Sequence, residues 1–532
     1  MTLAQPSGGL GLVERVEPHN PTRRVESDCR RRFLVAARPP ATPHAEKKVE
    51  NHAPEVVDGR ENDPMRTIPP RLRPLLDAAS PVQQLAARLV AAGHQCFLVG
   101  GSVRDALLDA PHDVGRDVDV ATDARPKEVE RLVRDWADHV WLQGARFGTV
   151  GCERSGTRLE ITTFRAEVYR PESRKPEVAF ADDVDTDLSR RDFTINAMAL
   201  RLPEPELVDP FHGAADLAAR RLRTPLEPEV SFADDPLRML RAARFIAAFE
   251  LRPDPELVAA VEEMHGRLKI VSAERIREEL TRLLLVPHPS AGLWFLCRTG
   301  LADEFLPELN ALQLEQDPIH QHKDVLAHTI AVVSKTRPEL EVRLAALLHD
   351  IGKPKTRAVG PGGVTFHHHE VVGARMAEER LRALRFPNEV VENVARLVYF
   401  HLRIHTYAMG WTDRAVRRYA RDAGPLLEPL NHLVRQDCTT RNKAKARALQ
   451  RRIDELEQRI ARLREQEELD RIRPPLDGRQ VMAFLGIEPG PLVGEALQHL
   501  LEVRLDEGPV DEAEAYERLA AWARERGMRP AR

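Results

Sequence analysis

The sequence predicts an α+β protein in which a small mixed α/β domain is followed by a mostly α-helical body. The chain has 532 residues, enough for about three or four domains. Strand-like segments alternate with helical ones as far as about residue 225. From residue 230 to 470 strand signals nearly vanish, and apolar residues recur at helical spacing.

Composition excludes several classes of protein. Lys and Arg total 79 against 83 Asp and Glu, and the net charge of -4 excludes a globally basic nucleic-acid binder, although a local basic face stays open. No apolar run approaches the roughly 18 residues of a membrane span, and no secretory signal is apparent, so no membrane partner is expected. The five scattered cysteines form no CxxC pair, which excludes a zinc ribbon and fits a reducing cytoplasm.

Residues 1–64 differ from the rest of the chain. They contain eight prolines and no sustained apolar periodicity, so we expect a disordered N-terminal extension. Apolar periodicity begins at Met65, which is a candidate for the true start of translation.

The mixed domain is expected to span residues 80–225. An amphipathic helix ends at Gly93, and a short apolar run then leads into a glycine turn. Alternating segments predict further strands. The helix is expected at 82–93, and the first strand with its turn at 96–101. Three further strands are expected at 117–122, 148–153 and 158–167.

The helical body is expected to divide into residues 226–310, 311–445 and 446–532. Helical spacing is clear at 237–251, 273–285 and 342–353. A 4-3-4-3 seam predicts a coiled-coil-like helix over 446–466, broken by Pro474 and Pro475 and followed by a helical tail; the seam residues are Leu449, Ile453, Leu456, Ile460 and Leu463.

Two carboxylates are the first candidates for chemistry. Asp117 and Asp119 are two apart in a strand pattern, so both project from one face and can hold divalent cations. Glu160, on a later strand, is a candidate third carboxylate or a plain surface residue. Taken alone, the two aspartates favour a solvated strand face.

A glycine turn precedes these carboxylates. Gly100, Gly101 and Ser102 follow a strand, and such a turn lets backbone N–H groups approach a phosphate closely. Alone it is an ordinary turn. Together with the aspartates, within 20 residues, it predicts a phosphate cradle facing a metal site.

Four segments in chain order resemble the motifs of class II tRNA nucleotidyltransferases and bacterial poly(A) polymerases. They are GGSVRDALL with DVDVAT, then RRDFTINAMA at 190–199, LVDPFHGAADLAARRLRTP at 207–225 and ADDPLRMLRAARF at 233–245. The resemblance runs from about residue 80 to the C-terminus. It implies a polymerase-β-like palm in which Asp117 and Asp119 hold Mg²⁺, which would activate the 3′-hydroxyl of tRNA and neutralise pyrophosphate.

The resemblance also implies a nucleotide site. Its residues are Gly100, Gly101, Ser102, Arg104, Arg191, Asp192, Asn196, Asp235, Arg238, Arg241 and Arg244. The alternative for Arg191, Asp192 and Asn196 is a capped helix start with neighbouring core residues.

Asp235 and Arg238 are three apart on a predicted helix and so share a face. Cytosine and adenine both present an amino donor beside a ring acceptor, whereas uracil and guanine present the reverse. A carboxylate beside a guanidinium therefore suits CTP and ATP. A surface salt bridge is the alternative. The family often has Glu where this chain has Asp234.

The segment after the metal strand favours CCA addition over poly(A) addition. ARFGTVGCE lacks the basic stretch of the poly(A) polymerases. The long polar segment 166–189 resembles the flexible loop of full CCA-adding enzymes, which CC-only enzymes lack. A poly(A) polymerase, or a regulatory RNA- or nucleotide-binding protein with decayed sites, remains the alternative.

A second constellation resembles HD-domain phosphohydrolases. His328, the pair His349-Asp350, His369 in a triple histidine, and Asp437 follow one another as metal-ligand candidates. The resemblance implies a transition metal, such as Ni²⁺, Mn²⁺ or Fe²⁺, and phosphoester hydrolysis. His322 and His401 are either further ligands or plain surface residues, and we favour the plain surface role for each.

A basic segment is the candidate tRNA contact. Between Arg435 and Arg464 there are ten Lys or Arg against four Asp or Glu. The candidates are Arg441, Lys443, Lys445, Arg447, Arg451 and Arg452. A solvated helix face is the alternative to phosphate contacts. No protein partner is implied.

Overall fold

A computed structural model describes residues 69–108, 117–168, 177–314, 324–360, 363–438, 443–467 and 473–529. The predicted extension, residues 1–64, lies outside these ranges. Among the described helices, none has the length and apolarity needed to cross a bilayer.

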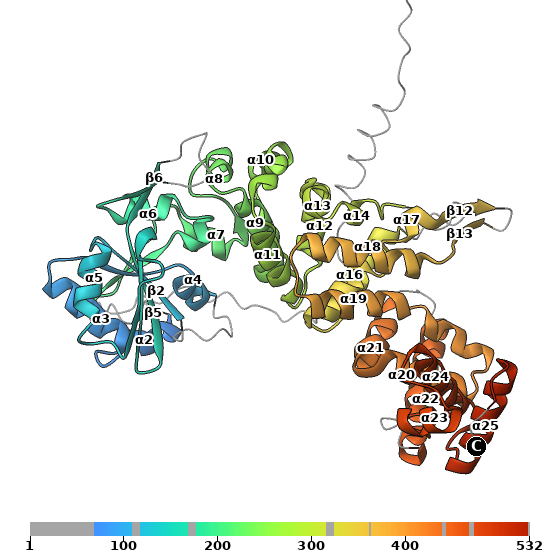
Figure 1. The fold of residues 1–532 in the computed structure, drawn as a ribbon. Helices are drawn as coiled ribbons and strands as arrows, with labels where there is room; N and C mark the ends of the chain where they lie inside the picture. The colour runs from blue at the N-terminus through green and yellow to red at the C-terminus, as the bar shows by residue number, and fades with distance from the viewer. Residues whose placement is uncertain are drawn as a thin grey trace, which may run out of the picture. The chain divides into compact units, whose positions relative to one another are not determined.

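The first part of the described chain is built on a seven-stranded mixed sheet in the order β3-β4-β5-β2-β1-β8-β9. Figure 1 labels its neighbouring strands β2 and β5. Strand β2 pairs antiparallel with β1 and parallel with β5, which places it inside the sheet. The strands are β1 Cys96–Val99, β2 Asp117–Thr122, β3 His139–Trp141, β4 Thr149–Arg154, β5 Thr157–Thr163, β8 Ala199–Leu202 and β9 Glu206–Val208. The sheet contains the predicted strands at 96–99, 117–122 and 148–153 and adds β3, β8 and β9. The strand predicted at 158–167 is divided: its first part is β5, and its last residues lie in β6, Arg165–Val168, which belongs to a separate two-stranded sheet.

Two helices that position the site flank this sheet. Helix α3, Pro81–Ala91, starts where the Ser80 side chain accepts the N–H of Gln83. Its buried Val82, Leu85 and Leu89 join the core that the sheet contributes to. Helix α4, Gly101–Leu107, leaves β1 through Gly100, whose φ of 71° is readily adopted only by glycine.

Hairpins appear where none was expected. The segment 166–189, predicted as a loop, contains most of a hairpin of β6, Arg165–Val168, with β7, Glu177–Phe180, followed by helix α6, Val184–Ser189. Residues 169–176 lie outside the description. A second hairpin, β12 Arg357–Gly360 with β13 Gly363–Phe366, interrupts the helical body.

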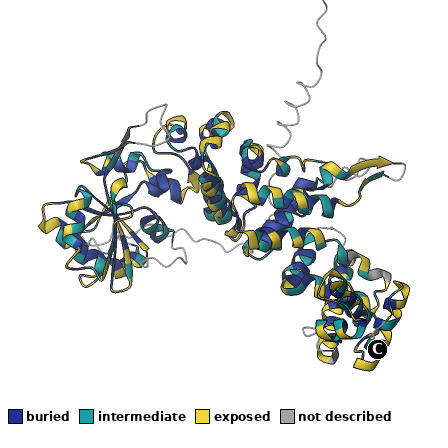
Figure 2. Cartoon of the chain, viewed as in Figure 1, coloured by how far each residue is buried: buried dark blue, intermediate teal, exposed yellow. Residues whose placement is uncertain are grey.

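The helical body contains the predicted helices. Its buried residues line the sides on which the helices pack (Figure 2). The helices used below are α8 Pro228–Asp234, α9 Leu237–Phe249, α11 Ala273–Leu285, α15 Val325–Lys335, α16 Leu340–Leu348, α18 His369–Ala383, α19 Asn388–Phe400, α20 Asp413–Ala423 and α21 Leu427–Asp437. Arg343 of α16 is 1% exposed and donates to the carbonyls of Leu284 and Val286, so it joins α16 to the end of α11.

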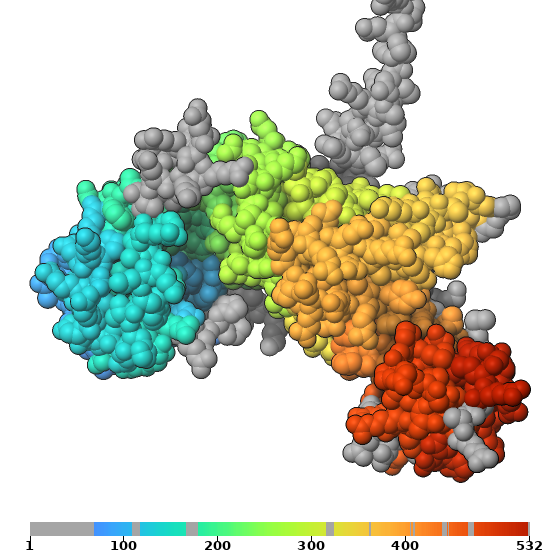
Figure 3. Space-filling model, in the orientation of Figure 1, coloured from blue at the N-terminus to red at the C-terminus, as the bar shows by residue number. Residues whose placement is uncertain are grey.

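The predicted seam lies on α22, Lys443–Glu467. All five seam residues are buried, and α22 packs against α20 and α21. The helical tail consists of α23 Gly478–Leu485, α24 Pro491–Glu507 and α25 Glu512–Glu525, in red in Figure 3. These helices enclose a core of their own that includes Val481, Leu500 and Trp522.

Candidate active site and metal centre

The carboxylates of the palm lie on two neighbouring strands. Asp119 of β2 is directly opposite Glu160 of β5 in the parallel register, and Asp117 is opposite Arg158. Burial, opposed by Arg191 and reinforced by the Glu160 and Asp117 carboxylates, raises the pKa of Asp119. A cation would relieve this repulsion, so the residues fit a divalent metal.

The glycine turn closes onto these carboxylates. A Cβ at Gly100 would lie 3.3 Å from Arg191 Nη1 and 3.4 Å from Asp119 Oδ2. Glycine is therefore needed at position 100 both for its positive φ and to keep this corner open. Ser102, one residue into α4, does not line the cavity described next.

A cavity of about 520 Å³ joins the palm to α9. Ten of the eleven expected nucleotide-site residues line it, together with Asp119, whereas Asp117 does not. Sequence reasoning missed seven other lining residues: Val99, Val120, Thr162, Arg165, Arg190, Phe245 and Arg282. Eight arginines and three aspartates line the cavity, a balance that suits a polyanion such as a nucleoside triphosphate.

Asp192 connects the two walls of this cavity. Its Oδ1 accepts from Asn196 Nδ2 at 2.8 Å, and its Oδ2 accepts from Arg241 Nε at 2.9 Å. Asn196 in turn accepts from Arg104 Nη1 at 2.5 Å. Burial alone would raise the pKa of Asp192, but Arg241 and Asn196 outweigh it and lower the pKa to about 2. Asp192 is therefore ionised and holds Arg241 toward the palm.

Asp235 and Arg238 both line the cavity but are not paired with each other. Arg238 Nη1 donates to Ser231 Oγ at 2.8 Å, and Arg238 Nη2 donates to the Arg190 carbonyl. Asp235 Oδ2 accepts from Arg275 Nη2 at 2.7 Å. The described contacts thus do not include the salt bridge weighed as the alternative.

The expectation that Asp235 lies on the same helix as Arg238 is wrong. Asp235 has extended backbone between α8 and α9, with φ of −138° and ψ of 100°. Pro236 explains this, since a proline disfavours the helical conformation of the residue before it. The carboxylate still enters the cavity from the start of α9.

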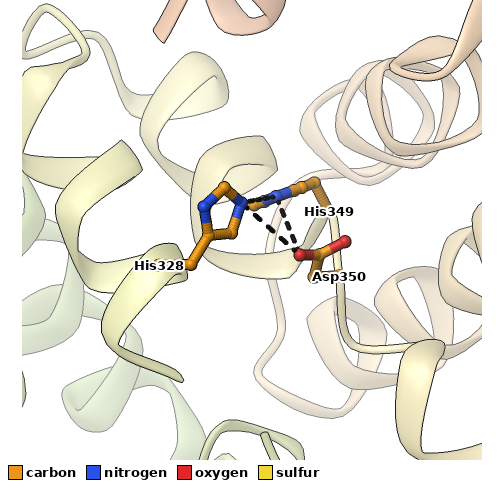
Figure 4. Close-up of side chains that lie close together, drawn as sticks. All are labelled: His328, His349 and Asp350. Atoms are coloured by element: carbon orange, nitrogen blue, oxygen red, sulfur yellow. Dashed lines mark hydrogen bonds and ion pairs between the residues drawn. The ribbon is translucent and has the colours of Figure 1, made fainter. Parts of the chain in front are cut away.

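A second cluster lies in the helical body. His328 of α15 and His349 at the end of α16 bring their Nε2 atoms within 3.3 Å, and Asp350 Oδ2 lies 3.3 Å from His349 Nε2 (Figure 4). Asp437 Oδ1 is 2.9 Å from His328 Nε2. Four of the five expected ligands therefore converge here, from three helices and the turn that follows α16.

His369 and His401 extend this cluster. Each belongs, with Asp350, to a second group whose ligand atoms lie within 4.8 Å of one another. The expectation that His401 is a plain surface residue is wrong: it is 1% exposed, because α19 ends against the cluster. His367 and His368 are exposed, and His322 lies outside the described residues.

Backbone carbonyls orient three of these rings. The Nδ1 atoms of His349, His369 and His401 lie 2.6–2.8 Å from the carbonyl oxygen three residues earlier. Because a carbonyl only accepts, each Nδ1 carries a proton and each ring turns its Nε2 atom toward the centre of the cluster. The Nε2 atoms of His369 and His401 are buried without a hydrogen-bond partner. This donor set fits a transition metal.

The electrostatics of the cluster favour a cation. Burial lowers the pKa of His349, but the Asp350 and Asp437 carboxylates outweigh it and raise the pKa to about 10. Burial and the neighbouring His349 lower the pKa of His401 to about 3, so that ring stays neutral.

The basic segment is described in part. Arg447, Arg451 and Arg452 are exposed on α22, and Arg441 lies outside the described residues. Lys443 and Lys445 belong to α22, but their side chains lie outside the description. Arg435 pairs with Asp454 and Glu457, so it is engaged within the protein.

Three family models match the chain in order. Residues 96–223 match the poly(A) polymerase head domain, 250–313 the probable RNA and SrmB-binding site of polymerase A, and 325–463 the HD domain. The first covers the sheet and the last covers the histidine cluster.

Curated relatives span most of the chain. The A-adding tRNA nucleotidyltransferase of Deinococcus radiodurans is 34% identical over 80% of this chain and 95% of its own. The CC-adding tRNA nucleotidyltransferase of Thermus thermophilus is 35% identical over 79% and 92%. The CCA-adding enzyme of Lactobacillus helveticus is 40% identical over 40% of this chain and 52% of its own.

A solved structure shares the fold. The CCA-adding enzyme of Bacillus stearothermophilus in complex with CTP aligns with a TM-score of 0.60 and 24% identity, over 86% of this chain and 99% of that one. The resemblance noted from the four motifs and the HD series is confirmed, and the chain belongs to the tRNA nucleotidyltransferase and poly(A) polymerase family, with an HD domain in its helical body.

Proposed function

We propose that the protein adds CCA to the 3′ end of tRNA without a template, using CTP and ATP. The observation that carries this proposal is the single cavity in which the palm residues Gly100 and Asp119 meet Asp235 and Arg238 at the start of α9. The groups for the reaction and the groups for choosing the base can therefore contact the same bound nucleotide.

Asp117 and Asp119 would hold Mg²⁺, with Glu160 beside them. When bound, Mg²⁺ supplies activation of the 3′-hydroxyl and charge neutralisation at the phosphates. The cavity arginines, including Arg104 and Arg191, would bind the triphosphate, and Asp192 keeps Arg241 directed toward it.

Base choice rests on complementary hydrogen bonding. Asp235 offers an acceptor to the amino group of cytosine or adenine, and Arg238 offers a donor to the adjacent ring nitrogen. Uracil and guanine would place like groups against each other and leave buried polar atoms unpaired. The exposed arginines of α22 would contact tRNA phosphates, which carry no sequence information.

In this proposal the palm would span 80–225 and the nucleotide-reading region 226–310, the division expected from the sequence. The HD region would span 311–445, and the last helices would contribute to tRNA contact. Such an enzyme would work in the cytoplasm, where tRNA is matured.

Single-nucleotide incorporation tests the proposal. The full chain is incubated with tRNA ending before the CCA, after the first C, or after both C residues, with one nucleotide at a time. CTP should extend the first two substrates and ATP only the third. Addition of A alone or of C alone would identify a partial enzyme of the kind found among the relatives, and repeated addition of A would identify a poly(A) polymerase.

The histidine cluster supports a second activity, metal-dependent hydrolysis of phosphate monoesters or 2′,3′-cyclic phosphates. Two buried Nε2 atoms carry this proposal. That of His401 has no hydrogen-bond partner, and that of His369 has only Asp350 Oδ1 nearby, at 3.4 Å. Burying such nitrogens is costly unless they bind something. His328, His349, Asp350 and Asp437 would hold one metal, and Asp350, His369 and His401 can hold another. Bound metal supplies an activated water for hydrolysis. Chelation followed by Ni²⁺ or Mn²⁺ should remove and restore this hydrolysis, and a chain that binds only Mg²⁺ and hydrolyses neither ester would refute it.

A further inference from the structure

Glu279 of α11 lies behind the nucleotide cavity and contacts three of its arginines. Its Oε2 accepts from Arg244 Nε at 2.7 Å, and its Oε1 lies 3.4 Å from Arg282 Nη1 and 3.6 Å from Arg241 Nη1. The three arginines line the cavity, whereas Glu279 does not. We propose that Glu279 is a positioning residue of the nucleotide site, which fixes these guanidinium groups for CTP and ATP; this rests on the function proposed above.

A carboxylate is needed here because the guanidinium groups repel one another. Glu279 is 3% exposed and the Arg244 side chain 16%, so water screens the charges at this contact poorly, whereas Arg282 is 60% exposed and better screened. Burial lowers the pKa of Arg244, and Glu279 is the main group opposing that effect. Arg241 is held from two sides, by Asp192 of the palm and by Glu279 of α11.

The other polar residues on this face of α11 point to the same role. Arg275, Glu279 and Arg282 are four and three residues apart, so they share one side of the helix. Arg275 reaches Asp235, and Arg282 lines the cavity. This face of α11 thus contacts both the carboxylate acceptor of the nucleotide site, Asp235, and its guanidinium donors.

Two effects compete when Glu279 is removed. The cavity becomes more positive, which favours a triphosphate at long range. The guanidinium groups lose their fixed directions, so binding must pay for ordering them. We expect loss of direction to dominate, because a buried hydrogen-bonded charge that loses its partner typically costs enough to weaken binding about tenfold.

The test measures equilibrium binding of CTP and of ATP, each with Mg²⁺, to the full chain by calorimetry. Glu279→Ala should raise both dissociation constants about tenfold. Glu279→Gln keeps an acceptor for Arg244 and should show a smaller increase. The matched control is Glu278→Gln, because Glu278 is adjacent on α11 but 59% exposed; it should bind like the parent.

A purely structural role predicts a lower melting temperature with unchanged nucleotide affinity. Dissociation constants of Glu279→Ala within twofold of the parent would therefore overturn the proposal. If that variant does not fold, Glu279→Gln decides by the same criterion. A parent that binds nucleotides but does not extend tRNA would refute the proposed function, while the binding comparison would still decide the role of Glu279.

Discussion

Replacing Asp192 by asparagine should destabilise the protein in a way that depends on pH. The carboxylate is 8% exposed and accepts hydrogen bonds from the Phe193 backbone, Asn196 and Arg241. Asparagine keeps the shape but removes the charge that Arg241 requires. The lost free energy of unfolding should therefore equal the extra stabilisation that the folded protein gives to ionised Asp192 over protonated Asp192.

The magnitude follows from the pKa of Asp192, which falls from its ordinary 3.8 to about 2. At about 1.4 kcal/mol for each pKa unit, the ionised form contributes roughly 2.5 kcal/mol to the free energy of unfolding. Because the folded-state pKa lies below the unfolded one, this stabilisation is complete above about pH 5, declines as the pH falls past 3.8 and disappears as it falls through about 2.

Urea unfolding of the parent and of Asp192→Asn, repeated from pH 7 down to pH 3, measures this difference. The difference in the free energy of unfolding between the parent and Asp192→Asn should be constant from pH 7 to about pH 5 and should decrease below that. Asp135→Asn is the control, because Asp135 forms an exposed pair with Arg88 that solvent screens, and the unfolding midpoint should hardly move. A difference that is absent at pH 7, or that persists unchanged at pH 3, would refute the reasoning.

Four further substitutions, in three experiments, test the two sites. Asp119→Ala should abolish nucleotide incorporation while tRNA binding, measured by gel shift, persists; near-normal incorporation would contradict the palm assignment. Asp235→Ala and Arg238→Ala should let UTP or GTP compete, at about 1–3 kcal/mol of lost discrimination each; unchanged selectivity in competition assays would make the start of α9 merely structural. His349→Ala should eliminate hydrolysis of a 2′,3′-cyclic phosphate while tRNA extension continues, and parallel loss of both activities would show that the two sites are not independent.

The palm and the first HD ligands were predictable because short, local patterns encode them. Alternation fixes the common face of Asp117 and Asp119, and the glycine turn requires its backbone conformation wherever it occurs. The adjacent residues His349 and Asp350 at a helix end likewise indicate a candidate pair of metal ligands. In each case the residues that act together are close in sequence.

The contributions of α11 and of His401 were not predictable for the opposite reason. On a single helix, Arg275, Glu279 and Arg282 look like an ordinary solvated charged face, and only the packing of α11 on α9 turns them toward the cavity. A lone histidine after a helix carries no local signal, and burial of His401 depends on where α19 ends. The extended backbone of Asp235 could have been inferred from Pro236.

The carbonyl bonds of His349 and His401 have a consequence for how the cluster would take up the metal proposed above. Both residues stand directly after the last turn of a helix, α16 and α19, where backbone oxygens lack partners within the helix. Each imidazole therefore completes its helix and aims its ligand nitrogen with one bond. Rotamer freedom is lost when the chain folds, so metal capture requires little further ordering. Side-chain changes elsewhere cannot delete these acceptors, since they belong to the main chain.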